Sequence, residues 1–257
     1  MRVNASLFSH PGLVREKNED NFLFFGASLE NLTEPTHLNG DTLLDRPVIF
    51  GVFDGMGGIS AGEIASQIAA STSKSVFSLT SGNDANYEDV LLEICNKSNE
   101  AICAEMKSTA KKRMGSTASI LCFFQDGFVL CNIGDSPIFI LRNSRLVEIS
   151  KEHTEKENYE KVYGTSIEHK KYKLTQHLGI FPEEMIIEPN IVPGQTKEND
   201  RFLICSDGLT DMVSIKEIEA ILCEGRSPAE TANRLQQSAL NYGGKDNITI
   251  TCIDIVA

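Results

Sequence analysis

Four aspartates stand at the ends of short apolar runs, and this pattern constrains the fold more than any other feature of the chain. Runs of this length, rich in β-branched and aromatic residues, predict buried strands. A rigid strand fixes the backbone, so a carboxylate beside its end is held firmly. These aspartates are therefore candidates for a functional site. The junctions are Val48–Phe53 with Asp54, Phe202–Ser206 with Asp207, Leu130–Gly134 with Asp135, and Asp246 with the run that starts at Ile248.

Strand candidates follow one another without an intervening helix between residues 119 and 149. Gln125-Asp126-Gly127 and Arg142-Asn143-Ser144 are typical of hairpin turns, because their residues tolerate the backbone angles of a tight turn. The four strands of this region are predicted to form an antiparallel meander. The main strand candidates of the whole chain are Phe22–Phe25, Val48–Phe53, Ser119–Phe124, Phe128–Ile133, Pro137–Leu141, Phe202–Cys205 and Ile248–Ile255.

Helix signals occur in two other regions. A capping box at Ser60 and Glu63 predicts the start of one helix. A second helix is predicted from about Tyr87 to Lys107, and the short Asn83-Asp84 connection predicts that the two form an antiparallel pair.

A third helix is predicted to begin at Ser227, with Glu230 completing another capping box, and to end at Gly243-Gly244. The expected order of elements is strands, a helix pair, more strands and then helices. It differs from the strict strand–helix alternation of a βαβ protein. This order predicts the α+β class, with antiparallel sheet covered by helices.

The charge of the chain excludes some functions. Its 257 residues include 36 acidic and 24 basic ones, which gives a formal charge of −12. This balance argues against nucleic-acid binding and against adhesion to an anionic membrane surface. An acidic balance has two interpretations, an ordinary solvated surface or carboxylates gathered to hold cations, and the charge alone does not separate them.

The cysteines and the apolar segments indicate the compartment. There are seven cysteines, an odd number, most of them inside apolar runs and none in a CxxC pair. This usage favours free buried thiols in a reducing environment. The N-terminus lacks an apolar core of signal-peptide length, and no apolar stretch reaches the ~20 residues of a membrane span. A cytoplasmic protein is expected.

The segment from about 152 to 173 is polar, charged and without clear periodicity. It is predicted to be a surface excursion. Two interpretations remain open, an ordinary loop and a flap beside a functional site.

The chemistry of the aspartates favours a metal site. Hard divalent ions such as Mg²⁺ and Mn²⁺ prefer oxygen ligands, and a glycine after an aspartate lets the backbone carbonyl approach an ion. A single Asp-Gly pair is usually only a turn. Several aspartates at strand ends, with no histidine or cysteine ligand set, favour a carboxylate-ligated metal site. Near the N-terminus, Arg15 precedes Glu19 and Asp20. An arginine in this setting is either a surface ion-pair partner or a phosphate ligand.

Seven motifs, in this order along the chain, resemble the metal-dependent protein phosphatases (PPM, type 2C), especially the bacterial branch. Each motif alone is weak, and the ordered set is specific. The resemblance extends from Arg15 to about Ile255. The motifs are Arg15-x-x-Asn18-Glu19-Asp20, Asp54-Gly55-Met56-Gly57-Gly58, Gly115-Ser116-Thr117-Ala118, Ile133-Gly134-Asp135-Ser136, Leu174-Thr175-x-x-Leu178-Gly179, Ser206-Asp207-Gly208-Leu209 and Asp246-Asn247.

The resemblance implies a single phosphatase domain over 1–257, folded as a four-layer αββα sandwich of two antiparallel sheets flanked by antiparallel helix pairs. It implies two Mn²⁺ or Mg²⁺ ions, with a third as an option, and a metal-activated water that hydrolyses phosphoserine and phosphothreonine. The implied roles are metal binding by Asp54, the Gly55 carbonyl, Asp207 and Asp246, a third metal site at Asp135, phosphate binding by Arg15, and action through bound water by Glu19 and Asp20.

One position departs from the family pattern. Many eukaryotic members carry a histidine, proposed as general acid, where this chain has Met56. Protonation of the leaving group must then come from another source, or it matters less. His153 is expected to be a structural residue or an anchor of the 152–173 segment. No chemistry is assigned to His10, His37, His169 and His177.

The resemblance implies phosphorylated proteins as partners, with a cognate serine/threonine kinase and its substrates as an option, and a monomer is expected. Three alternatives stay open: a non-catalytic binding member of the same fold, a two-metal hydrolase of another substrate such as a nuclease, and a regulatory phosphatase dedicated to one partner protein. Loss of a ligand aspartate would favour the first, and every matched position is filled. The acidic surface argues against the second.

Overall fold

The computed structural model describes residues 1–28, 35–57, 61–80, 82, 85–109, 113–125, 127–165 and 171–257. Its strands form two antiparallel sheets. The first has the order β3-β1-β12-β11-β8-β9 and the second the order β10-β7-β6-β4-β2, with β5 paired to β4. The strands are β1 Arg2–His10, β2 Asp20–Leu23, β3 Thr36–Leu43, β4 Val48–Gly57, β5 Met114–Ser116, β6 Ala118–Phe124, β7 Gly127–Ile133, β8 Ile138–Arg142, β9 Arg145–Glu148, β10 Asn190–Gln195, β11 Arg201–Cys205 and β12 Ile248–Val256.

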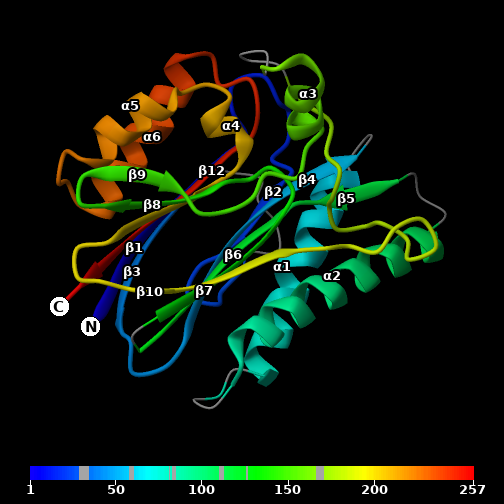
Figure 1. Cartoon of the computed structure of the whole chain (residues 1–257), viewed down its shortest axis with the longest axis horizontal. Helices are drawn as coiled ribbons and strands as arrows, with labels where there is room; N and C mark the ends of the chain where they lie inside the picture. Colours follow the sequence, from blue (N-terminus) through cyan, green and yellow to red (C-terminus); the bar gives the residue numbers. More distant parts are fainter. Residues whose placement is uncertain are drawn as a thin grey trace.

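A pair of helices covers the outer face of each sheet (Figure 1). The pair α1 and α2 packs on the second sheet, and α5 and α6 pack on the first. This is the predicted four-layer arrangement of helices, two sheets and helices. The helices are α1 Ala61–Thr80, α2 Tyr87–Thr109, α3 Lys156–Tyr163, α4 Asp207–Thr210, α5 Ile215–Leu222 and α6 Pro228–Asn241.

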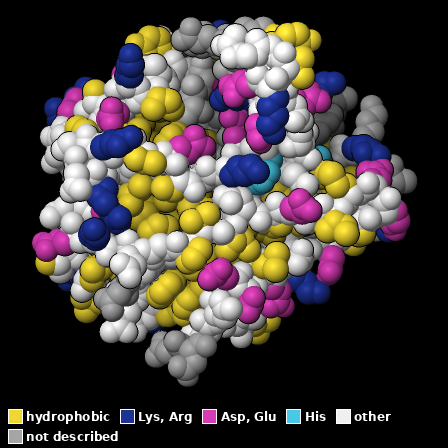
Figure 2. Space-filling model, in the orientation of Figure 1, with side chains coloured by type: hydrophobic (Ala, Val, Ile, Leu, Met, Phe, Trp, Pro, Cys, Tyr) yellow, Lys and Arg dark blue, Asp and Glu magenta, His cyan; other side chains and the backbone are white. Residues whose placement is uncertain are grey.

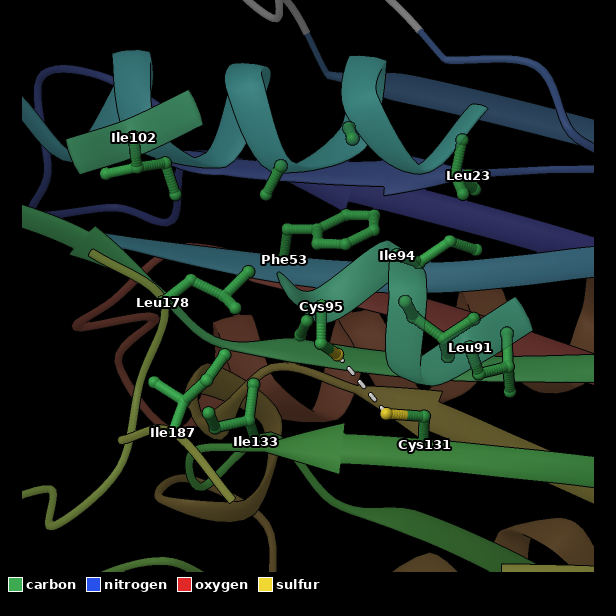
Figure 3. Packing of buried hydrophobic residues seen from close by; sticks show 14 of the residues in the cluster. Leu23, Phe53, Leu91, Ile94, Cys95, Ile102, Cys131, Ile133, Leu178 and Ile187 are labelled. Atoms are coloured by element: carbon green, nitrogen blue, oxygen red, sulfur yellow. Dashed lines mark hydrogen bonds between the residues drawn. The ribbon is translucent and has the colours of Figure 1, made fainter. Parts of the chain in front are cut away.

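Three apolar clusters fill the spaces between the four layers. The middle cluster lies between the sheets and is rich in aromatic rings, among them Phe50, Phe123 and Phe202, which meet edge to face. An outer cluster joins α1 and α2 to the second sheet, as Figure 3 shows for Phe53 and Ile94. Aromatic edge-to-face pairs add stability beyond the burial of their area. The two sheets are therefore a rigid base for residues at their ends.

The expected meander between residues 119 and 149 is wrong. β6 and β7 pair in the second sheet, whereas β8 and β9 pair in the first. The chain crosses between the sheets at Gly134, whose φ of +111° favours glycine. The crossing places Asp135 between the two sheets. The predicted hairpin at Arg142-Asn143-Ser144 is confirmed, because Asn143 and Ser144 both have positive φ values, as a type I′ turn requires.

The predicted helices are confirmed within the described residues. Helix α6 begins with the expected capping box, in which Ser227 Oγ accepts the Glu230 N–H and the Glu230 carboxylate accepts the Ser227 N–H. The Ser60 box, the Asn83-Asp84 connection and the turn residue Asp126 lie outside those residues.

All seven cysteines are free, and six of them are buried. Figure 3 shows Cys95 of α2 facing Cys131 of β7, with the two Sγ atoms 3.3 Å apart. Free buried thiols agree with the expectation from the sequence.

Candidate metal and phosphate site

A pocket of about 500 Å³ lies at one end of the sandwich. Parts of the chain that are far apart in the sequence reach it, among them the loop that carries Arg15 and Glu19, the end of β4, the Asp135 crossing, residues 171–174, and the turns at Asp207 and Asp246. Acidic and basic side chains gather in the region of α3 and α4 on the face drawn in Figure 2. The pocket therefore brings together every site residue that the sequence predicted except Asp20, which lies directly beneath it on β2.

Asp20 and Asp54 are neighbours across two strands. Asp20 opens β2 and stands opposite Asp54 in the register of β2 with β4. Ser206 Oγ donates to Asp20 Oδ2 over 2.8 Å, while Asp20 Oδ1 is buried and has no hydrogen-bond partner among the described residues. A buried carboxylate oxygen without a partner is costly and calls for a cation or water.

Asp54 lies inside β4 rather than after its end, because the strand continues to Gly57. Thr117 fixes its backbone from both sides: Asp54 N–H donates to Thr117 Oγ1 over 2.9 Å, and Thr117 N–H donates to the Asp54 carbonyl over 2.9 Å. Thr117 belongs to the Gly115–Ala118 motif, to which the sequence assigned no role. It acts here as a positioning residue.

Gly55 is packed between backbone atoms. Its N–H donates to the Glu19 carbonyl over 3.1 Å. A Cβ at this position would collide with the carbonyl oxygens of Glu19 and Gly62. The strand, α1 and the Glu19 loop approach this closely only because the residue is glycine.

Asp207 and Asp246 face each other from the two turns at the end of the first sheet. Asp207 follows β11 and begins α4, and Asp246 precedes β12. A Cβ at Gly208 would collide with the carbonyl oxygen of Asn247, so glycine allows the two turns to meet. Asp207 Oδ1 is buried and has no hydrogen-bond partner among the residues the structure describes.

Asn247 holds the loop that carries Arg15. Its Nδ2 donates to the carbonyls of Pro11 and Lys17 over 2.9 and 2.8 Å, and its Oδ1 accepts the Glu19 N–H over 2.8 Å. The side chain thereby ties the loop to the turn before β12. No local sequence signal assigns this role, because its partners lie at the other end of the chain.

Two cations converge on the same carboxylates. Arg15 Nη2 lies 2.8 Å from Asp246 Oδ2, and Lys171 Nζ lies 3.5 Å from that oxygen. Lys171 Nζ is also 2.6 Å from Asp207 Oδ2 and 3.8 Å from Asp211 Oδ2. Arg15 is a predicted site residue, whereas no sequence signal pointed to Lys171. His177, to which the sequence assigns no chemistry, also lines the pocket.

The surroundings of the pocket carboxylates disfavour their ionised form. Burial raises the pKa of Asp20 to about 7, against hydrogen bonds from Thr249 and Ser206, and the charge of Asp207 raises it further. Burial and the charge of Asp20 raise the pKa of Asp54 well above its usual range. Carboxylates gathered in this way need positive charge to stay ionised.

Asp135 occupies the crossing between the sheets, beside the 152–173 segment. Burial, followed by the charge of Asp207, raises the pKa of Asp135 to about 7. His153 fastens the crossing, because its N–H donates to the Gly134 carbonyl over 2.9 Å and its Nδ1 accepts the Gly134 N–H over 3.2 Å. These contacts agree with the expectation that His153 is a structural residue or an anchor of the 152–173 segment.

The donor set fits divalent cations. The carboxylate oxygens without partners and the raised pKa values of Asp20, Asp54 and Asp135 all indicate uncompensated negative charge. As the described side chains stand, no three histidine, cysteine or carboxylate residues converge on a single ion position. In this arrangement Arg15 engages an oxygen of Asp246 and Lys171 engages an oxygen of Asp207.

The family model for protein phosphatase 2C matches residues 39–240. The serine/threonine phosphatase stp of Listeria monocytogenes serotype 4b (strain F2365) is 29% identical over 98% of this chain and 96% of its own length. The serine/threonine protein phosphatase PstP of Mycobacterium tuberculosis (strain CDC 1551 / Oshkosh) is 31% identical over 96% of this chain and 44% of its own length.

Solved structures agree with these matches. A crystal structure of the Mycobacterium tuberculosis serine/threonine phosphatase PstP/Ppp has a TM-score of 0.81 at 27% identity, with each chain covered completely. The PstP catalytic domain in complex with two manganese ions also gives a TM-score of 0.81, at 29% identity and full coverage of both chains.

The chain therefore belongs to the protein phosphatase 2C family. The predicted fold, the predicted family and the predicted class of enzyme, a metal-dependent serine/threonine protein phosphatase, are confirmed by these matches.

Proposed function

We propose that this chain removes phosphate from phosphoserine and phosphothreonine in proteins, with Mn²⁺ or Mg²⁺ held by the carboxylates of the pocket. The observation that carries the proposal is the convergence of Asp54, Asp207 and Asp246 with Arg15 at one pocket. The serine/threonine phosphatases among its relatives, and the two manganese ions in the PstP catalytic domain, support it.

The metal ions would be held by Asp54, the Gly55 carbonyl, Asp207 and Asp246, with Asp135 at an additional site. When bound, such ions supply Lewis acidity, which activates water for attack on phosphorus and offsets charge on the phosphoryl oxygens. The protein's own part is to hold these carboxylates in a fixed geometry. Thr117, Asn247 and the close contact at Gly208 do this through the backbone.

Arg15 is proposed to bind the substrate phosphate. It stands at the rim of the pocket with a half-exposed side chain, so its guanidinium can reach an incoming phosphate while the backbone of its loop stays in place. A planar guanidinium binds two phosphate oxygens at once. Glu19 and Asp20 are proposed to act through bound water, Asp20 from beneath the pocket and Glu19 from the Arg15 loop.

Position 56, where many eukaryotic members have a histidine, is a methionine in this chain. Burial lowers the pKa of His153, the histidine that is hydrogen-bonded to Gly134 at the Asp135 crossing. Neither residue is proposed as the general acid. The structure places His177 at the pocket wall, where it is the histidine to examine for that role.

The partners are phosphorylated proteins. A cognate serine/threonine kinase and its substrates, a monomeric state and a cytoplasmic location are further parts of the proposal. No helix within the described residues has the length and apolar character to cross a membrane. The buried free thiols fit a reducing compartment.

The proposal is tested by an assay with Mn²⁺ on phosphoserine, phosphothreonine and phosphotyrosine peptides and on a bis-p-nitrophenyl phosphodiester. We expect hydrolysis of the first two peptides, its loss with EDTA, and its loss in the Asp54→Asn variant. Preferred hydrolysis of the diester would favour the nuclease class instead. If the Mn²⁺-bound protein hydrolyses none of the four substrates, the result would favour a non-catalytic member of the fold.

A further inference from the structure

Lys171 places its ammonium group on oxygens that the proposed metal site requires. Its Nζ is 2.6 Å from Asp207 Oδ2 and 3.5 Å from Asp246 Oδ2. Both aspartates are proposed metal ligands. A carboxylate oxygen that accepts a short hydrogen bond from an ammonium group is not free to coordinate a divalent ion in the same direction.

The two sides of this contact differ in burial. The Asp207 side chain is 10% exposed, whereas the Lys171 side chain is 58% exposed. Asp207 therefore depends on a nearby cation, because a buried carboxylate without one is costly. Lys171 does not depend on Asp207 in the same way, since its ammonium group can return to water. This asymmetry makes Lys171 the partner that can leave.

The backbone around Lys171 allows such an exchange. Two backbone hydrogen bonds join the two ends of the 152–173 segment at its base: Glu155 N–H donates to the Lys173 carbonyl over 2.9 Å, and Thr175 N–H donates to the His153 carbonyl over 2.8 Å. Lys171 lies just beyond this base. Its flexible side chain can withdraw from the carboxylates while these bonds stay intact.

We propose that Lys171 is a tethered counter-cation that competes with divalent ions for Asp207 and Asp246, so that metal binding displaces Lys171 from the pocket. The inference rests on the metal site assigned under the proposed function. Its consequence is that metal affinity is set by the 152–173 segment as well as by the carboxylates. A divalent ion carries twice the charge of the ammonium group and accepts more oxygen ligands, so it replaces Lys171 at sufficient concentration.

The adjacent residue offers a reporter of the exchange. Tyr172 lines the pocket and meets Tyr159 of α3 edge to face, with ring centroids 5.5 Å apart. The chain contains no tryptophan. A Tyr172→Trp variant would therefore carry a single tryptophan, which can be excited selectively, next to Lys171.

The test measures Mn²⁺ binding by titration calorimetry on EDTA-stripped protein. We compare the wild type with Lys171→Met and with Lys173→Met, a matched control. Lys173 lies on the same segment and lines the same pocket, but the described ion pairs to Asp207, Asp211 and Asp246 come from Lys171 and Arg15. We expect roughly tenfold tighter Mn²⁺ binding in Lys171→Met, and a change of less than about twofold in Lys173→Met.

Fluorescence gives the second measurement. In the Tyr172→Trp protein, Mn²⁺ should shift the tryptophan emission, and in Tyr172→Trp combined with Lys171→Met this shift should be largely lost. Unchanged Mn²⁺ affinity in Lys171→Met, or an equal gain in Lys173→Met, would overturn the exchange while leaving the metal site in place. Failure of the wild type to bind Mn²⁺ would overturn both the metal assignment and this inference.

Discussion

Asp20 lies directly opposite Asp54 in the antiparallel register of β2 and β4. Residues in this relationship direct their side chains to the same face of a sheet, and like charges there are destabilising. The pocket ion pairs described for Lys171 and Arg15 engage Asp207, Asp211 and Asp246 instead. The sheet thus holds two facing carboxylates whose repulsion is relieved either by protons or by cations. The metal ions of the proposed function would supply such cations.

The first prediction concerns stability without metal. Because the pKa of Asp20 is raised to about 7 and that of Asp54 is also raised, the folded chain binds more protons than the unfolded chain above pH 4. Stability must then fall as the pH rises toward and through 7. We expect urea unfolding in EDTA to give a lower free energy of unfolding at pH 8 than at pH 5, and added Mn²⁺ to reduce the difference.

The variant Asp20→Asn should flatten this pH dependence, because it removes one of the facing charges. Asp45→Asn is the matched control, since Asp45 is exposed and does not line the pocket. An Asp20→Asn protein whose stability falls with pH as steeply as that of the wild type would contradict the electrostatic interpretation.

The second prediction separates the proposed metal sites. Asp207 is buried beside Asp246, whereas Asp135 occupies the crossing between the sheets. We expect Asp207→Asn to lower kcat for a phosphothreonine peptide by roughly a hundredfold or more, even at high Mn²⁺ concentration. Asp135→Asn should lower the rate of phosphothreonine hydrolysis by roughly tenfold at low Mn²⁺ concentration, and the rate should recover as the Mn²⁺ concentration is raised, as expected of a weaker metal site. Equal behaviour of the two variants across a Mn²⁺ titration would argue against a separate site at Asp135.

The third prediction concerns Arg15. Its side chain pairs with Asp246 at the rim of the pocket. The hydrogen bond to that carboxylate, followed by the carboxylate's charge, raises the pKa of Arg15, so Arg15 stays charged. We expect Arg15→Ala to raise KM for phosphopeptides by roughly tenfold, with a smaller effect on Mn²⁺ binding. Arg145→Ala on β9 is the control, because Arg145 is exposed and outside the pocket. Unchanged phosphopeptide kinetics in Arg15→Ala would remove it from the phosphate-binding role.

Much of the fold could be predicted because its signals are local. An apolar run that stops at an aspartate, and the capping box of Ser227 with Glu230, each need only a few neighbouring residues. The strands β1 and β3 gave no such signal. β3 is an edge strand whose residues alternate between half-buried and exposed, and β1 carries polar residues such as Asn4, Ser6 and Ser9 in its run.

Other features depend on contacts between distant parts of the chain. The hairpin signals of residues 119–149 do not say which sheet receives each hairpin, so the separation of β7 from β8 could not be predicted. Lys171 stands in a polar segment without periodicity, and only the fold brings its ammonium group to Asp207 and Asp246. The motifs therefore gave the carboxylates of the site, but not the cation that the fold places among them.

The last prediction concerns the contact that holds Asp207 beside Asp246. A Cβ at Gly208 would meet the Asn247 carbonyl, so Gly208→Ala must push the α4 turn away from the turn before β12. Metal ligation depends on ligand positions within about 0.5 Å, so we expect Mn²⁺ affinity to fall by roughly tenfold or more. Gly82→Ala is the control, because a Cβ there meets no atom within 4 Å among the described residues. Calorimetric Mn²⁺ titrations, with circular dichroism to verify folding, compare the two variants. A folded Gly208→Ala protein that binds Mn²⁺ like Gly82→Ala would show that the two turns need not touch to form the site.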